Sequence, residues 1–303
     1  MKFLYWNINN QPSPFENSLK KLITDREIDV LILSENKLLS DTKILKDTDF
    51  VAVELKLNNS KSKWVKVYYK KNDDYQITHH TEHTEVDDDD EDTDNSEVDT
   101  NRQVNRIQVF KISGKIADTY FACIHFPSKL YHDEITHLQV VPNYKEKIHS
   151  LTQNSNRLFI LGDFNMNPFD YGMVEPLGFF AHNNRELINT DIQVKHGRNN
   201  IIYYNPSWTL LGDFVNKADY KENNRSGGSF FYKEKKSRCL YWHLIDQIIM
   251  RKALIDEFIS EDLEIIEEEA IKEEIKKDKI KGVNKIDHFP LKFSFKFKNK
   301  DNE

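Results

Sequence analysis

The sequence predicts a layered α/β protein in which short buried strands alternate with helices. A strand over residues 2–8, an amphipathic helix over 15–27 and a buried strand over 29–35 follow one another directly. Several later runs share the character of the second strand, with four or more apolar residues ended by a polar group. With 303 residues, of which 38% are hydrophobic, the chain can bury one large core, so we expect a single domain over residues 1–303.

The remaining elements follow from apolar patterning in chain order. Strands are expected at 50–57, 64–70, 106–112, 120–125, 158–161, 242–250, 263–266 and 291–297. Helices are expected over 131–151, with an interruption near Pro142, within 168–178, and over the charged segment 269–281.

Residues 72–100 lack apolar periodicity, and we expect them to form an acidic, mobile insertion in the domain. The formal net charge of −7 argues at first against a polyanionic substrate. Residues 82–99, however, hold eleven carboxylates and no Lys or Arg, and leaving these eleven out changes the charge from −7 to +4. The rest of the chain can therefore present a basic cleft.

The cysteines and the N-terminal residues indicate a cytoplasmic protein. Cys123 and Cys239 lie in strand-like contexts without metal-ligand or redox spacing, so we interpret them as reduced core thiols. The first strand reaches Asn7 and Asn9 too soon to form a signal peptide. Because no run of about 18 apolar residues occurs, we expect no membrane partner.

The segment 157–165, Arg-Leu-Phe-Ile-Leu-Gly-Asp-Phe-Asn, is the strongest candidate for chemistry. Its apolar run predicts a buried strand that stops at Gly162. Asp163 and Asn165 follow with a spacing of two, which places both side chains on one side of extended backbone. Taken alone, this segment has a plain alternative as a strand-terminal turn, because Gly, Asp and Asn are ordinary turn residues.

Other strand-like segments also end or are interrupted by polar groups. These groups are Asn7, Glu35, His125, Asp246 and the pair Asp287-His288. Most of them have simple structural explanations when considered singly. Asp246 is the exception, since a carboxylate within the apolar run 244–249 is costly to bury without a partner.

Together these groups can form a site for phosphoryl chemistry. Glu35 and Asp287 offer the carboxylate oxygens that a magnesium-type cation prefers. Asp163 can orient or deprotonate a water, while Asn7 and Asn165 can donate to phosphoryl oxygens. His125 and His288 can share acid, base and charge-stabilising work, with Asp246 fixing the tautomer of His288.

The order of these motifs resembles that of the endonuclease/exonuclease/phosphatase superfamily, which has the DNase I-like fold. The resemblance spans residues 6–290 and rests on segments 6–9, 33–37, 124–127, 162–165, 244–248 and 286–290. It implies an α/β (α+β) four-layer sandwich, in which two packed mixed sheets are flanked by helices and the site lies at one rim. It also implies Mg²⁺ or Mn²⁺ and hydrolysis of a phosphodiester or phosphomonoester.

Carried over by motif, the resemblance makes Glu35, Asp287 and Asn7 metal-site residues. The catalytic and phosphate-binding groups are then Asn7, His125, Asp163, Asn165, Asp246 and His288. His125 matches the histidine of DNase I-like members, but the usual carboxylate partner from an earlier strand is missing in Trp64–Lys71. Ile286 also replaces the serine that usually precedes the final Asp-His.

The substrate is expected to be nucleic acid. Basic and aromatic residues occur in loops beside the motifs, as in proteins that track phosphates and stack bases: Arg102, Arg106, Lys195, Arg198, Arg225, 233–238, Tyr203, Tyr204, Trp208 and Phe230. The alternatives are a phosphatase or phosphodiesterase acting on a small phosphate ester or lipid head group, and a binding module without activity. DNA or RNA, endo- or exonucleolytic cleavage and oligomeric state stay open.

Overall fold

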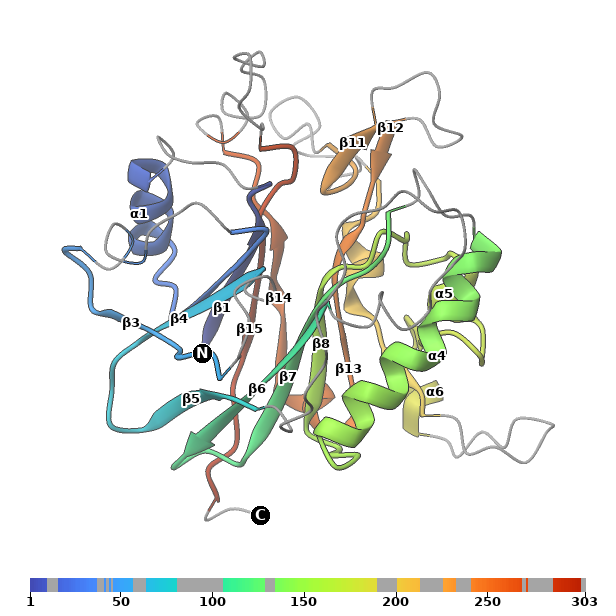
Figure 1. Ribbon diagram of the computed structural model, residues 1–303, viewed down its shortest axis with the longest axis horizontal. Coiled ribbons are helices and arrows are strands. Elements are labelled where there is room, and N and C mark those ends of the chain that lie inside the picture. Colours follow the sequence, from blue (N-terminus) through green and yellow to red (C-terminus); the bar gives the residue numbers. More distant parts are fainter. Residues whose placement is uncertain are drawn as a thin grey trace, which may run out of the picture.

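The computed structural model describes residues 1–9, 16–36, 41, 44, 46–56, 64–80, 106–128, 134–189, 201–212, 226–232, 241–268, 271 and 286–300. Within them lie two large β-sheets, packed face to face between helices (Figure 1). This is the four-layer arrangement predicted from the sequence. None of the described helices is long and apolar enough to span a membrane.

The first large sheet has six strands in the order β14-β15-β1-β2-β4-β3. Its strands are β1 (Lys2–Asn7), β2 (Val30–Ser34), β3 (Phe50–Ala52), β4 (Val65–Lys70), β14 (Phe258–Ile265) and β15 (Leu291–Phe295). β1 pairs in parallel with β2 and antiparallel with β15, so the central strand joins segments far apart in the chain.

The second large sheet has seven strands in the order β5-β6-β7-β8-β13-β10-β9. They are β5 (Tyr75–His79), β6 (Ile107–Gly114), β7 (Thr119–His125), β8 (Leu158–Asp163), β9 (Ala181–His182), β10 (Tyr203–Tyr204) and β13 (Asp246–Met250). A separate hairpin consists of β11 (Phe230–Tyr232) and β12 (Tyr241–His243).

The main core lies between the two large sheets and is dense in aromatic rings. Phe3 of β1 stacks on Phe293 of β15, with ring centroids 5.0 Å apart, and meets Phe159 of β8 edge-on at 5.5 Å. These three side chains are fully buried. Because inward side chains alternate along each strand, this packing fixes the strand registers, and with them the position of every strand end.

Helices cover the outer face of each large sheet. α1 (Glu16–Asp25) packs Leu19, Leu22 and Ile23 on the six-stranded sheet. α4 (Glu134–Leu151) covers the seven-stranded sheet and passes through Pro142 without the predicted interruption, its residues on both sides of the proline being buried. The shorter helices are α5 (Tyr171–Val174), α6 (Arg185–Asn189), η2 (Pro206–Leu210) and η3 (Lys252–Glu257).

The start of the insertion predicted over about residues 72–100 is wrong, because Tyr75–His79 form β5, in which Ile77 and His79 alternate inward. Residues 81–105 lie outside the described residues, as does nearly all of the helix predicted over 269–281.

The strand predicted over 242–250 is two strands in different sheets. Asn167 accepts the backbone N–H of Leu244 through its Oδ1, and Gln247 donates to the Leu244 carbonyl, so side chains take up the backbone groups at the break. Asp246 is therefore the first residue of β13 and does not interrupt a longer strand.

Candidate active site

The predicted site residues meet at one rim where strands of both large sheets end. In the seven-stranded sheet, Asp163 is paired with His125 on one side and with Asp246 on the other. In the six-stranded sheet, Asn7 ends β1 opposite Ser34, and Glu35 follows directly. The sheet registers therefore bring together residues that are widely separated in the sequence, and Asp287 and His288 join them just before β15.

His288 is held in one orientation by contacts on three sides. Its Nδ1 lies 2.8 Å from Oδ2 of Asp246, and its carbonyl accepts the indole N–H of Trp6 at 2.9 Å. The ring of Phe230 in β11 packs against the imidazole with centroids 4.7 Å apart. Nδ1 is thus committed to Asp246, and Nε2 is the nitrogen that faces Asp287 Oδ1, at 3.8 Å, and Asp163 Oδ2, at 3.9 Å.

The pair His288–Asp246 favours the imidazolium form. Burial lowers the pKa of His288, but the charge and hydrogen bond of Asp246, together with Asp287 and Asp163, raise that pKa to about 10. Asp246 is fully buried and is positioned in turn by Ser229, whose Oγ accepts its backbone N–H at 3.1 Å. A permanent positive charge at this point can stabilise a phosphoryl oxygen.

We therefore expect His288 to remain protonated well above pH 8 in protein freed of divalent cations. Because the folded pKa lies above the ordinary value of 6.5, the pair stabilises the fold fully below pH 6.5. That contribution is lost as the pH rises towards about 10. Histidine NMR titration with EDTA measures the pKa directly, and Asp246→Asn should return it towards the ordinary value. An unchanged pKa in Asp246→Asn would contradict this explanation.

Asp163 lies at the centre of the site and is 3% exposed. Its Oδ1 accepts the backbone N–H of Asn165 at 2.8 Å, and its Oδ2 is 3.5 Å from the amide nitrogen of Asn7. Burial raises the pKa of Asp163, His288 opposes that rise, and the negative charge of Asp246 adds to it. Asp163 consequently has a higher proton affinity than an exposed aspartate, while the His288 imidazolium favours the carboxylate form that a general base must have.

His125 differs from His288 in its charge state. Burial, the Arg106 guanidinium and His288 lower the pKa of His125 to about 3, so this imidazole is neutral near pH 7. Its Nδ1 is 3.5 Å from Glu35 and its Nε2 is 3.8 Å from Asp163. No carboxylate from β4 pairs with it; Trp64, just before β4, meets the imidazole edge-on at 6.1 Å.

Glu35, Asn7 and Asp287 form the acidic side of the site. The amide nitrogen of Asn7 donates to Glu35 Oε1 at 3.1 Å, and the amide of Asn9 donates to Asp287 Oδ2 at 3.3 Å. Glu35 has a backbone φ of +48°, a strained conformation for a residue with a side chain. Asp287 Oδ1 is buried without a hydrogen-bond partner among the described residues, and burial raises the pKa of this carboxyl.

The carboxylates of Glu35 and Asp287 fit a hard divalent cation better than a group of ligands that includes His288. Ligand atoms of Asp163, Asp246 and His288 do lie within 4.8 Å of one another. When no cation is bound, however, the raised pKa of His288 favours the imidazolium, which has no free electron pair to offer a metal. The carboxylates of Glu35 and Asp287 supply the oxygen ligands that Mg²⁺ and Mn²⁺ prefer.

Asn165 occupies its predicted place but is partly committed elsewhere. Its backbone φ is +49°, and its amide nitrogen donates to the carbonyl of Phe126 at 2.8 Å. This bond ties the turn after β8 to the end of β7, which keeps Asp163 and His125 in register. One N–H of the amide is thereby used within the protein, and the second is available for the predicted phosphate contact.

Several supporting residues were not predicted from the sequence. Trp6, Asn9 and Ser229 hold His288, Asp287 and Asp246 through the hydrogen bonds given above. Only their position in the sequence could have indicated a supporting role. Asn9 follows Asn7 by two residues, and Ser229 follows a Gly-Gly pair. Gly228 is required there because a Cβ would lie 2.5 Å from the His243 carbonyl oxygen.

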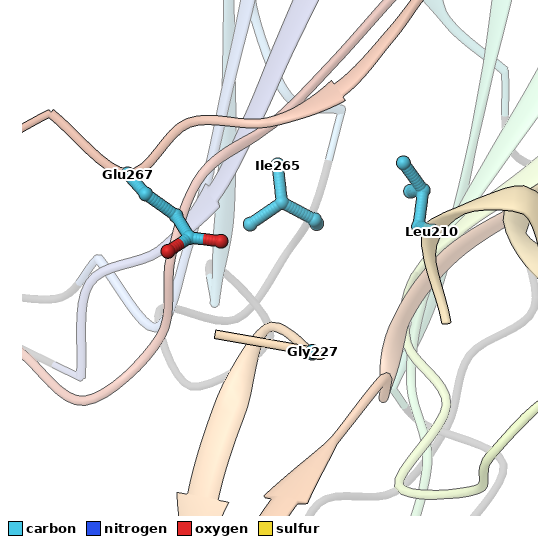
Figure 2. A pocket seen from close by; sticks show the side chains of 5 residues that line it. Leu210, Gly227, Ile265 and Glu267 are labelled. Atoms are coloured by element: carbon cyan, nitrogen blue, oxygen red, sulfur yellow. The ribbon is translucent and has the colours of Figure 1, made fainter. Parts of the chain in front are cut away.

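A small pocket near the β11–β12 hairpin has a structural explanation. It is lined by Leu210, Gly227, Gly228, Ile265 and Glu267, and none of the predicted site residues lines it (Figure 2). The Glu267 carboxylate accepts both the backbone N–H and the hydroxyl of Ser226 at 2.9 Å. Glu267 thus fixes the segment that carries Ser229 and Phe230 towards the site.

The aromatic residues proposed for base stacking divide into two groups. Tyr203 and Tyr204 belong to β10 and are 0% and 6% exposed, so their prediction as stacking residues is wrong. Phe230 and Trp208 are half-buried. The basic residues Arg102, Lys195, Arg198, Arg225 and 233–238 lie outside the described residues, which leaves Arg106 beside His125.

Comparisons with known proteins give the same fold. No protein-family model and no curated protein matches the sequence. An endonuclease/exonuclease/phosphatase family protein from Bacteroides thetaiotaomicron is similar in structure, with a TM-score of 0.51 and 11% identity over 99% of this chain and 96% of the other.

Two further solved structures are similar to this chain and have different activities in their names. A 3′-5′ exonuclease from Neisseria meningitidis has a TM-score of 0.50 and 16% identity to this chain. A mannosyl-6-phosphatase from Bacteroides thetaiotaomicron has a TM-score of 0.50 and 12% identity. Each match covers 97% of this chain and 99% of the other. The chain therefore has the DNase I-like fold over nearly its whole length.

Proposed function

We propose, from the DNase I-like fold and the groups gathered at its rim, that this protein is a phosphoesterase dependent on Mg²⁺ or Mn²⁺. The observation that carries the proposal is the buried arrangement of His288, Asp246 and Asp163. It places an imidazolium, its carboxylate partner and a second carboxylate of raised pKa side by side. An anion-stabilising cation next to a general base is the combination that phosphoester hydrolysis needs.

Glu35 and Asp287 would hold the divalent cation, with Asn7 oriented beside them. Bound there, the cation would supply Lewis-acid polarisation of a phosphoryl oxygen. Oδ1 of Asp287 supports this placement, because this buried oxygen makes no hydrogen bond among the described residues and has only the His288 imidazole nearby, at 3.8 Å. Asn7 donates to Glu35 and fixes the direction of that carboxylate.

The chain's own residues account for the proton transfers and the charge. Asp163 takes a proton from the attacking water as the water oxygen forms a bond to phosphorus. The bond between phosphorus and the ester oxygen breaks, and the departing oxygen leaves with the electron pair and gains a proton from solvent. His288 donates from Nε2 to a phosphoryl oxygen, and neutral His125 and Asn165 add N–H donors.

Within this class we propose a nuclease acting on DNA or RNA. Phe169 and Tyr171, in the segment that follows Asn165, are 53% and 56% exposed, and Phe169 contacts the ring of Trp208 at 6.3 Å. Exposed aromatic rings in the segment that follows a site residue such as Asn165 can stack on nucleobases. The exonuclease among the similar structures supports this version.

A phosphatase acting on a small phosphate ester is the second candidate. The mannosyl-6-phosphatase is a phosphatase with the same fold. Its TM-score to this chain, 0.50, equals that of the exonuclease. A small substrate would need the cationic and amide donors of the rim but not Phe169 or Tyr171.

A substrate panel separates these candidates. We expect cleavage of plasmid DNA or single-stranded RNA with Mg²⁺ or Mn²⁺, and activity at least 100-fold lower in EDTA, because loss of the cation removes its stabilisation of phosphoryl charge. Phe169→Ala/Tyr171→Ala should weaken cleavage of nucleic acid and leave 4-nitrophenyl phosphate hydrolysis unchanged. Release of inorganic phosphate from mannose 6-phosphate without nucleic-acid cleavage would favour the phosphatase. Undiminished activity in EDTA would contradict metal dependence.

A further inference from the structure

Arg106 lies at the rim immediately before β6 and directs its guanidinium towards His125. Its Nη1 is 3.5 Å from both Nδ1 and Nε2 of that imidazole. A hydrogen bond to a ring nitrogen lies in the ring plane and favours one nitrogen. Two equal contacts at the long limit therefore indicate that the guanidinium rests against the ring, and its N–H groups make no other hydrogen bond among the described residues.

Arg106 also forms no ion pair with a carboxylate among the described residues, although Glu35 and Asp163 are close by. Both carboxylates are near the same imidazole, since Glu35 is 3.5 Å and Asp163 3.8 Å from its ring nitrogens. Arg106 is exposed, so its positive charge is accessible to a substrate. Two acidic groups and one guanidinium thus border a single neutral imidazole.

The contact with Arg106 occurs at His125, the histidine for which the sequence offers no carboxylate partner. Trp64 to Lys71 supplies no carboxylate for His125, and Trp64 meets the imidazole edge-on instead. A carboxylate beside His125 would hold a proton on it, whereas a guanidinium beside it adds donors for an anion. Planar guanidinium groups bind two phosphate oxygens at once, which suits a position next to a phosphoryl site.

We propose that Arg106 is a phosphoryl-binding residue of this protein, which contacts the non-bridging oxygens of the substrate beside His125. The proposal rests on the phosphoesterase function above and adds to it a second cationic contact besides His288. The substrate class that fits is a phosphate ester with two unesterified oxygens turned towards the open rim. His125 then serves as a neutral donor between Arg106 and the scissile phosphorus.

The test compares Arg106→Ala and Arg106→Lys with the wild type on bis(4-nitrophenyl) phosphate in Mg²⁺. We expect Arg106→Ala to lower kcat/KM about 100-fold, as the loss of one preorganised anion donor does, and Arg106→Lys to retain part of the activity. Added guanidinium chloride at millimolar concentration should restore activity to Arg106→Ala by at least tenfold. The matched control is Lys115→Ala, which removes one exposed positive charge at the far end of the β6–β7 hairpin.

Binding of inorganic phosphate, measured by calorimetry with Mg²⁺, tests the contact without any turnover. We expect Arg106→Ala to weaken phosphate binding at least tenfold and Lys115→Ala to leave it unchanged. Equal phosphate affinity in the wild type and Arg106→Ala would overturn the proposal, as would unchanged kcat/KM or a loss that guanidinium does not restore. A wild type that binds phosphate through Arg106 but hydrolyses nothing would overturn the proposed function alone.

Discussion

Asp163→Asn is expected to lower kcat for phosphoester hydrolysis about 10³-fold, because general-base catalysis contributes about 10²–10⁴-fold and an amide cannot accept the proton of the attacking water. The substitution keeps the shape of the side chain. An Asn oxygen can still accept the Asn165 N–H that Oδ1 of Asp163 accepts at 2.8 Å. Steady-state kinetics with saturating Mg²⁺ measures the loss, and KM should change much less than kcat.

Asp170→Asn is the matched control for this substitution. Asp170 is also a buried carboxylate in the segment after β8, but its Oδ2 accepts the backbone N–H of Asn167. We expect it to keep kcat within about threefold of the wild type, since it removes no proton acceptor from the site. A comparable loss in both variants would mean that the charge stabilises the segment and that Asp163 is not the base.

Gly162→Ala is expected to destabilise the fold by about 4 kcal/mol or more, which is at the upper end for single substitutions. Gly162 has a φ of +141°, and a Cβ at this position would lie 2.0 Å from the carbonyl oxygen of Ile124. Both clashing groups belong to the backbone of adjacent strands, so neither can rotate away. Chemical denaturation monitored by circular dichroism measures the free energy of unfolding.

Gly212→Ala separates steric overlap from backbone strain. Gly212 also has a positive φ, of +87°, but a Cβ there would meet none of the described residues within 4 Å. Its substitution should cost only the strain of a left-handed residue, about 1–2 kcal/mol. If both variants lost the same stability, the close approach of β7 and β8 at Gly162 would not be the cause.

The sequence was most informative where a strand is buried and ends on a polar residue. The runs before Asn7, Glu35 and Asp163 are apolar on both faces, so their position in a covered sheet could be predicted. Since the carboxyl ends of such strands meet at one rim, the convergence of the site residues followed from their place in the chain. The structure brings them together, and their catalytic roles remain predictions.

Features set by tertiary contacts could not be predicted in the same way. The apolar run 242–250 is typical of one strand, yet it is divided between two sheets at Leu244, whose N–H donates to Asn167 and whose carbonyl accepts from Gln247. The strand at Tyr75–His79 lies next to a strongly acidic tract, and its alternation is too short to stand out. The contact of Arg106 with His125 depends on the pairing of β6 with β7, which no local pattern reports.

The pairing of β1 with β15 also determines when this site can form during synthesis. The indole of Trp6 binds the carbonyl of His288, 282 residues further along the chain. A nascent polypeptide on the ribosome has neither His288 nor Asp287 until residues 286–295 have emerged. The rim site therefore cannot be complete before that point, whatever part of the core has already folded.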